Sequence, residues 1–154
     1  MRISQDGIDF IKDWEHFVPW PYHGKADAPG VMTVGYGHVI KAEDRIPYPM
    51  TPMSATDLLL LDCETAENEI ARVVKVELNQ NQYDALCSFV FNVGMEHIEF
   101  SPFMRHLNAG QFDVACAHWK LFDKSNGVEV PGLSDRRLAE ISLFWKPVGD
   151  ENAG

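Results

Sequence analysis

A carboxylate interrupts the apolar face of the first predicted helix. Ile8, Ile11 and Trp14 recur at helical spacing and mark the inward stripe of a helix over residues 4–15. Glu15 comes four residues after Ile11 and seven after Ile8, so it falls on the same stripe. The pattern predicts a short amphipathic helix that ends by holding a charged side chain against the protein interior.

Burial against apolar surface disfavours the charged form of a carboxyl group. We therefore expect Glu15 to have a raised pKa and to keep a proton near neutral pH, as a general acid requires. The alternative is a helix-end side chain that leans into solvent. Asp27 lies in a turn rich in Gly and Pro and should stay ionised, although it also suits a residue that caps its own loop. Two carboxyl groups in contrasting environments favour glycosidic bond cleavage.

Turn formers and prolines divide the rest of the N-terminal half. Residues 20–40 have the pattern of a hairpin or small sheet, and a proline-rich connector follows over residues 46–52. Thr51 as N-cap, with Pro52 in the first turn, predicts a long helix to about residue 74. We expect its core-facing side to carry Leu58, Leu61, Thr65 and Ile70.

The C-terminal half has the pattern of successive helices. Capping residues and prolines mark their starts, and Gly or Pro follows their ends. The expected helices run from Asn79 to Gly94, from Ser101 to Gly110, through Phe112 to Trp119, and from Ser134 to just before Pro147. A small sheet followed by helices indicates an α+β class that is mostly α.

The bulk properties exclude several functions. A chain of 154 residues with 45% hydrophobic side chains suits one globular domain. Its net charge of −10 argues against nucleic-acid binding, because neutralising phosphates requires clustered Lys and Arg. No apolar run reaches the length of a signal peptide or a membrane span, so we expect synthesis in a cytosol and no stable membrane association.

The cysteines and histidines suggest no metal or thiol chemistry. Cys63, Cys87 and Cys116 are odd in number and lie inside helical patterns, which favours reduced, buried thiols. A catalytic Cys would need an activating His, and the pair Cys116 and His118 matches no known nucleophile motif. His38 has no second His or Cys at zinc-like spacing, so we expect no metal site.

Three blocks of sequence carry a family resemblance. The first joins Glu15, Asp27 and Gly30 to the hairpin residues Thr33 to His38, the second covers residues 78–86 and 88–94, and the third covers residues 132–140. In this order they resemble the phage-type lysozymes of glycoside hydrolase family 24, the endolysin family that includes the lysozyme of the T-even phages. The resemblance spans residues 4 to about 145, which is nearly the whole chain.

By this resemblance the chain is a single lysozyme-like domain, residues 1–154, with an active-site cleft between two lobes. A long helix joins a small N-terminal lobe, which holds the hairpin or small sheet, to a helical C-terminal lobe. The expected bounds are about 16–50 for the small lobe, about 51–75 for the linking helix, and about 76–147 together with the N-terminal helix 4–15 for the helical lobe.

The resemblance implies that Glu15 is the catalytic acid and that Asp27 and Thr33 hold the attacking water. Asp27 and Thr33 keep the family's spacing relative to each other. Eleven residues separate Glu15 from Asp27, however, which is three more than is usual in the family. The longer turn, near residues 23–26, either returns Asp27 to the cleft or holds it away.

The same resemblance implies structural roles for a histidine and an arginine. His38 is expected to form a salt bridge with Asp62 on the long helix. Arg137 resembles the arginine that faces the catalytic Glu in this family and steadies its ionised form. The alternatives are that Arg136 has this role, or that Arg137 is simply a solvated surface residue.

The implied activity is that of an N-acetylmuramidase, which hydrolyses the β-1,4 bond between N-acetylmuramic acid and N-acetylglucosamine in peptidoglycan, with inversion. Asn92 and Tyr36 would bind the sugar, the alternative for Asn92 being a helix C-terminal cap. No cofactor is implied. Two alternatives stay open: a peptidoglycan-binding or scaffolding module with little turnover, and a lytic transglycosylase, which needs no water-activating Asp.

The family also implies a biological setting. The chain would be a monomeric phage endolysin, made in the host cytoplasm without a signal peptide, that relies on a holin to reach the cell wall during host lysis. Its acidity fits this substrate poorly, because peptidoglycan stem peptides carry carboxylates. We therefore expect a locally positive groove edge formed by Arg105, Lys120, Arg136 and Arg137.

Overall fold

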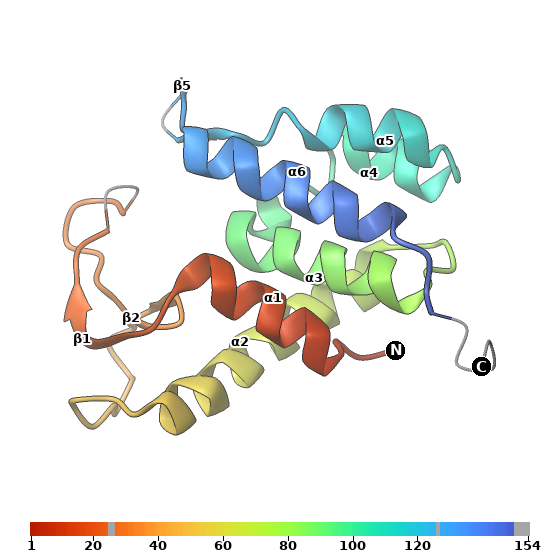
Figure 1. The fold of residues 1–154 in the computed structure, drawn as a ribbon. Coiled ribbons are helices and arrows are strands. Elements are labelled where there is room, and N and C mark those ends of the chain that lie inside the picture. The colour runs from red at the N-terminus through yellow and green to blue at the C-terminus, as the bar shows by residue number, and fades with distance from the viewer. Residues whose placement is uncertain (25–26, 126, 150–154) are drawn as a thin grey trace.

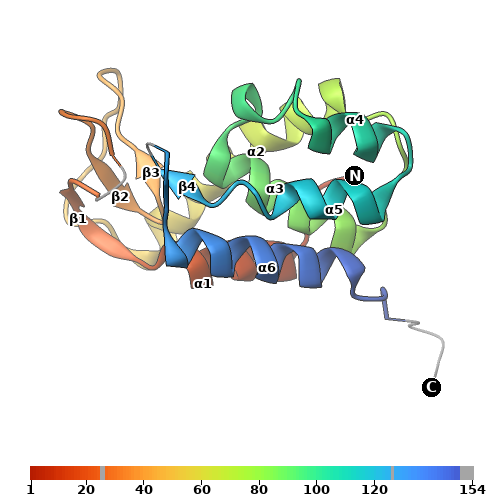
Figure 2. The same cartoon turned by 90° about the horizontal axis from the view of Figure 1, so that it is seen from above.

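The computed structural model describes residues 1–24, 27–125 and 127–149. In this part of the chain a small antiparallel sheet is followed by a long helix and a group of shorter helices (Figures 1 and 2). The elements are α1 (Gln5–Glu15), β1 (Val18–Tyr22), β2 (Thr33–Gly35), β3 (His38–Val39), α2 (Pro52–Val73), α3 (Gln80–Val93), the 3₁₀ helix η1 (Met95–His97), α4 (Pro102–Asn108), α5 (Phe112–Trp119), β4 (Lys124–Ser125), β5 (Val128–Glu129) and α6 (Pro131–Trp145). The predicted class, α+β and mostly α, is confirmed.

The first three α-helices begin at their predicted capping residues. The Ser4 hydroxyl accepts a hydrogen bond from the Gly7 backbone N–H at 3.1 Å. Thr51 and Asn79 each form a reciprocal capping box with the residue three positions later. These side chains satisfy first-turn N–H groups that have no partner inside a helix, which explains why α1, α2 and α3 begin where the sequence predicts.

The start of α6 differs from the prediction. The helix begins at Pro131, three residues before Ser134. A proline is well tolerated in the first turn, where its missing N–H would have no partner within the helix. The Ser134 hydroxyl instead donates to Asp123 Oδ2 at 3.3 Å. The short β4–β5 hairpin before this helix is also absent from the prediction.

The buried face of α2 also differs from the predicted one. Ile70 is buried and Leu58 is half-buried, but Leu61 is 62% exposed and Thr65 is exposed. The apolar residues that α2 buries are Ala55, Leu59, Cys63, Ala66, Ile70 and Val73. The four consecutive leucines over residues 58–61 point to all sides of the helix, so periodicity does not identify the side that packs.

The sheet has the strand order β1-β2-β3 and is antiparallel. Val18 pairs with Gly35 and Tyr22 pairs with Thr33, with an irregular register between the two pairs. Two prolines in β1 cannot donate to the ladder, which accounts for this irregularity. The register places Tyr22 beside Thr33 at the end of the sheet that leads into the long turn.

The main core fills the helical lobe around α3, which packs against α1, α2 and α6 (Figures 1 and 2). The Phe89 ring lies 5.0 Å from Trp119 and 5.2 Å from Phe103 between centroids. The three cysteines are free and buried, as predicted. Burial raises the pKa of the Cys63 thiol to about 12, so this thiol is unreactive at neutral pH.

Candidate active site

Glu15 is the last residue of α1, and its carboxyl group lies between α6 and the turn after β2. Arg136 of α6 donates from Nη1 to Glu15 Oε1 at 2.5 Å. On the other side, a Cβ atom built on Gly37 would lie 2.8 Å from Glu15 Cδ. The side chain keeps 17% exposure. The carboxyl group is thus mostly buried at the end of the apolar face of α1, and an arginine of α6 faces it.

Asp27 is anchored to the sheet by two donors. The Thr33 hydroxyl donates to Asp27 Oδ2 at 2.9 Å, and the Gly24 N–H donates to the same oxygen at 2.8 Å. Thr33 is buried in β2. The longer turn thus brings Asp27 back to β2, although residues 25 and 26 of the predicted 23–26 insertion lie outside the described residues.

Tyr22 of β1 pairs with Thr33, the residue that holds Asp27. Its pKa is raised, first by burial and then by the negative charges of Glu15 and Asp27. The sequence analysis missed Tyr22. The signal that could have found it is its pairing with Thr33 across the predicted hairpin.

His38 is held between two carboxylates. Its Nδ1 lies 2.8 Å from Asp62 Oδ2, which is the expected ion pair, and its Nε2 lies 2.8 Å from Asp44 Oδ2. The hydrogen bond to Asp62 is the largest cause of the raised pKa of His38, and Asp44 adds to it while burial opposes it. The cluster ties β3 to α2 and to the loop before it, and Asp44 is the member that the sequence analysis missed.

The arginine that faces Glu15 is Arg136, which corrects the assignment of this contact to Arg137. Arg137 is fully buried; its Nε lies 2.8 Å from Glu140 Oε1, and its Nη2 donates to Asn92 Oδ1 at 2.7 Å. Successive helical residues point about 100° apart, so two neighbours cannot both face α1. Both arginines are buried, so neither contributes to the predicted basic groove edge.

Glu140 joins the two arginines inside the helical lobe. It is fully buried, and its carboxylate lies 3.4 Å from Arg136 Nε. It also accepts hydrogen bonds from the Ser88 hydroxyl at 2.6 Å and from Trp119 Nε1 at 3.3 Å. Burial raises the pKa of Glu140, and burial lowers the pKa of Arg137 to about 10. A chain of charges thus runs from the acid at the end of α1 into the core.

The two predicted sugar-binding residues occupy different settings. Asn92 is half-buried near the end of α3, with its amide oxygen bound by Arg137. Tyr36 is half-buried between α1 and the sheet, 5.7 Å from the Phe17 ring and under Lys12 Nζ at 5.3 Å. The roles of both residues stay predictions.

A hollow of about 610 Å³ lies at the junction of the lobes. Its lining includes Gly37, His38 and Val39 from the sheet side and Phe91, Gly94 and Met95 from the helical side. A second hollow, of about 570 Å³, is lined by Asn92, Val93, His97, Leu121, Phe122, Lys124, Ser125 and Leu133. Of the predicted site residues, His38 and Asp62 line the first hollow and Asn92 lines the second, whereas Glu15, Asp27 and Thr33 line neither, so the predicted active-site cleft stays a prediction.

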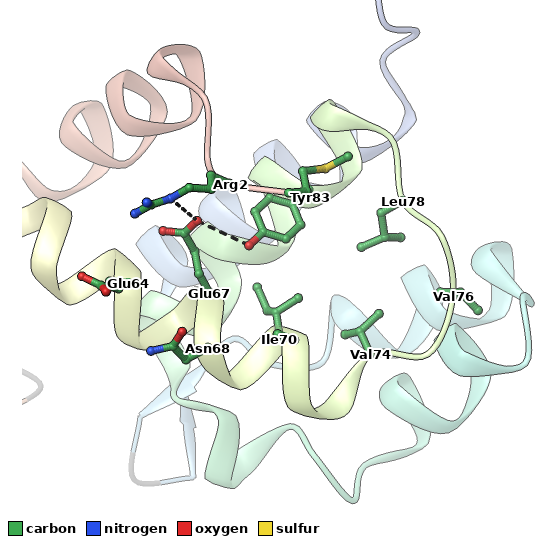
Figure 3. A pocket seen from close by; sticks show the side chains of 11 residues that line it. Arg2, Glu64, Glu67, Asn68, Ile70, Val74, Val76, Leu78 and Tyr83 are labelled. Carbon is green, nitrogen blue, oxygen red and sulfur yellow. Dashed lines mark hydrogen bonds and ion pairs between the residues drawn. The ribbon is translucent and has the colours of Figure 1, made fainter.

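Another pocket, of about 440 Å³, lies beside the N-terminus (Figure 3). The Tyr83 hydroxyl and the Arg2 guanidinium both point to the Glu67 carboxylate there (Figure 3). None of the predicted catalytic or sugar-binding residues lines this pocket. This pocket is therefore separate from Glu15 and Asp27, and we assign it no part in the catalytic reaction.

Sequence and structure comparisons agree on a family. The family model described as phage lysozyme matches residues 12–140. The endolysin of Salmonella phage P22 is 35% identical over 147 residues, covering 94% of this chain and 98% of that protein. The endolysin of Bacillus phage PZA is 35% identical over 145 residues, covering 94% of this chain and 55% of that protein. This chain therefore spans about half the length of the Bacillus phage relatives that it matches.

A solved structure supports the same conclusion. The muramidase domain of SpmX from Asticaccaulis excentricus superposes with a TM-score of 0.83 at 31% identity, covering 95% of this chain and 99% of that one. The matched range, residues 12–140, spans the positions of Glu15, Asp27, Thr33 and the two arginines of α6. The chain belongs to the phage lysozyme family, glycoside hydrolase family 24.

Proposed function

We propose that this protein is an N-acetylmuramidase that hydrolyses the β-1,4 bond between N-acetylmuramic acid and N-acetylglucosamine in peptidoglycan. The observation that carries the proposal is that two acids of this phage lysozyme family member, Glu15 and Asp27, are held by different partners. One carboxyl group is held by an arginine of the helical lobe and the other by the hydroxyl of a buried threonine in the sheet. Two carboxyl groups in different settings are what glycoside hydrolysis uses.

In this mechanism Glu15 donates a proton to the glycosidic oxygen as the bond from that oxygen to the anomeric carbon breaks. A water held by Asp27 and Thr33 attacks the anomeric carbon from the opposite face and gives its proton to Asp27. The product has inverted configuration. Arg136 stabilises the negative charge that Glu15 acquires when it loses its proton. No cofactor takes part.

The biological role proposed with this activity is host cell lysis by a monomeric endolysin that is made in the host cytoplasm and released by a holin. Two relatives described above are called endolysins, which supports the role. Among the described residues, the structure has no helix with the length and apolar character needed to span a membrane.

The test is clearance of purified peptidoglycan sacculi, measured as loss of turbidity, by the wild type and by Glu15→Gln. The wild type should clear the suspension and Glu15→Gln should not, because the amide cannot donate the proton. Asp13→Asn is the matched control, since Asp13 is an exposed acid on the same helix, and it should clear normally. Binding without clearance by the wild type would instead support a scaffolding module.

A second measurement separates hydrolysis from lytic transglycosylation. Mass spectrometry of the released muropeptides should find reducing muramic acid ends, because water enters the product. Asp27→Asn should abolish release. A 1,6-anhydro product that Asp27→Asn still releases would overturn the role proposed for Asp27 and Thr33.

A further inference from the structure

Two exposed aromatic rings stack on the surface of the small lobe. Trp20 of β1 is 56% exposed and Tyr48 is 37% exposed, and their ring centroids lie 6.2 Å apart with 25° between the ring planes. Large aromatic side chains normally contribute to a core, so a stacked pair left in solvent suggests a contact surface. None of the three hollows described above is lined by Trp20 or Tyr48. We call this pair the aromatic platform.

The backbone holds the aromatic platform in place. Each ring is flanked by prolines, Pro19 and Pro21 around Trp20 and Pro47 and Pro49 around Tyr48. Proline fixes the backbone angle φ and removes conformational freedom. The Met50 N–H donates to the Pro19 carbonyl at 2.9 Å, which joins the segment of Tyr48 to β1. A ligand that stacks on these rings would therefore find them already ordered.

The two chain segments that form the aromatic platform contain no charged side chain, and Arg45 directly precedes the second of them. Residues 17–22 and 46–50 contain no Asp, Glu, Lys or Arg, although the protein has a net charge of −10. Of the four basic residues expected at the groove edge, only Arg105 and Lys120 are exposed. Charge attraction is thus a poor way for this protein to hold a polymer that carries carboxylates, and a neutral contact is needed.

We propose that the aromatic platform binds a sugar ring of the glycan strand at a site outside the catalytic groove. The proposal rests on the proposed function for its ligand. The face of a pyranose ring presents C–H groups with a slight positive charge, and the face of an aromatic ring is slightly negative, so the two stack. The glycan strand is neutral along its rings and places its charged peptides to the side, which matches an uncharged surface on an acidic protein.

A lipid surface is the main rival ligand, because Trp and Tyr also gather at membrane interfaces. Membrane-binding surfaces of soluble proteins usually add Lys and Arg that attract anionic lipids. The two segments of the aromatic platform contain neither residue. The glycan strand is therefore the ligand that the observations favour, and lipid binding is an outcome that the experiment can detect.

The test is cosedimentation with purified sacculi, with every variant built on Glu15→Gln so that the glycan is not consumed. Trp20→Ala should bind about tenfold more weakly, the order of loss expected when one stacking ring is removed, and Trp20→Phe should keep most of the binding. High salt should not weaken the binding, because stacking is not screened. Trp145→Ala is the matched control, since Trp145 is 51% exposed and lies at the far end of α6; it should bind normally.

Four results would overturn the proposal that the aromatic platform binds the glycan strand. These are normal binding by Trp20→Ala and Tyr48→Ala, equal loss by Trp145→Ala, salt-sensitive binding, and loss of binding to phosphatidylcholine–phosphatidylglycerol vesicles rather than to sacculi. On the active background, hydrolysis of a short soluble muropeptide should have an unchanged kcat/KM in Trp20→Ala, which also shows that the variant is folded. If the wild type does not clear sacculi but Trp20→Ala still loses binding to them, the proposed catalytic function is wrong and the proposed glycan binding by the aromatic platform is supported.

Discussion

Replacing Gly37 by alanine should remove activity by displacing Glu15. Gly37 has a φ of 76°, and an added Cβ would lie 2.8 Å from Glu15 Cδ and 3.3 Å from its Cγ. Ordinary van der Waals contact begins near 3.4 Å and Glu15 Oε2 would lie closer still, so the carboxyl group must retreat by more than about half an ångström. Because misplacement of a catalytic group by about 1 Å can cost about 100-fold in rate, we expect a loss of roughly 10- to 100-fold.

Gly110→Ala is the matched control for this change. Gly110 has a φ of 75°, and its added Cβ would meet no other atom within 4 Å. Both substitutions force alanine into the left-handed region, which costs roughly 1–2 kcal/mol. For a protein of this size that cost lowers the Tm by roughly 2–8 °C in each variant. The variants should therefore be similar in stability and different in activity.

The assay compares initial rates of sacculus clearance well below both melting temperatures, with the Tm taken from circular dichroism. Normal clearance by Gly37→Ala would refute the reasoning, since it would mean that Glu15 moves without consequence. An equal loss of clearance by Gly110→Ala would also refute it, because backbone strain alone would then explain the effect.

Two further predictions concern buried charge. Glu140→Gln leaves the fully buried Arg137 without its ionic partner and should cost about 3–5 kcal/mol of stability, seen as a Tm lower by roughly 6–20 °C. Glu99→Gln, which removes the surface ion pair with Arg72, is the control and should change the Tm little. A Tm of Glu140→Gln equal to that of the wild type would disprove this account. His38→Gln should destabilise the fold most below pH 6.5 and less as the pH rises through the raised pKa of His38. The reason is that Asp62 and Asp44 stabilise the protonated imidazolium form of His38. Tm measured from pH 5.5 to 9 tests this, and a constant difference from wild type would contradict it.

The starts of α1, α2 and α3 were predictable because their causes are local. Ser4, Thr51 and Asn79 act on N–H groups within three residues, so the sequence contains all the information needed. The face of α2 depends instead on which neighbours it packs against. Where the sequence places leucines at four positions in a row, local pattern cannot choose between Leu59, which is buried, and Leu61, which is exposed.

The site residues likewise divide into those that local sequence predicts and those that depend on packing between distant segments. Asp27 and Thr33 lie six residues apart in one hairpin, and the structure joins them by a hydrogen bond. Tyr22 required the pairing of β1 with β2, which depends on a register that two prolines disturb. Glu140 gave no sequence signal beyond its position on the helix of the two arginines, because burial of a carboxylate becomes evident only when the helices are packed.

The two carboxyl groups of the proposed mechanism are held by different lobes. Arg136 fixes Glu15 from α6, and Arg136 is in turn held by Glu140 in the helical core. Among the described residues, Asp27 is held from the small lobe, by the Thr33 hydroxyl and the Gly24 N–H. Any movement of the sheet relative to α6 therefore changes the distance between acid and base while each keeps its own partners. Because α1 ends at Glu15 and leads into β1, we expect its packing to affect the separation of the two carboxyl groups, on which the proposed inversion depends.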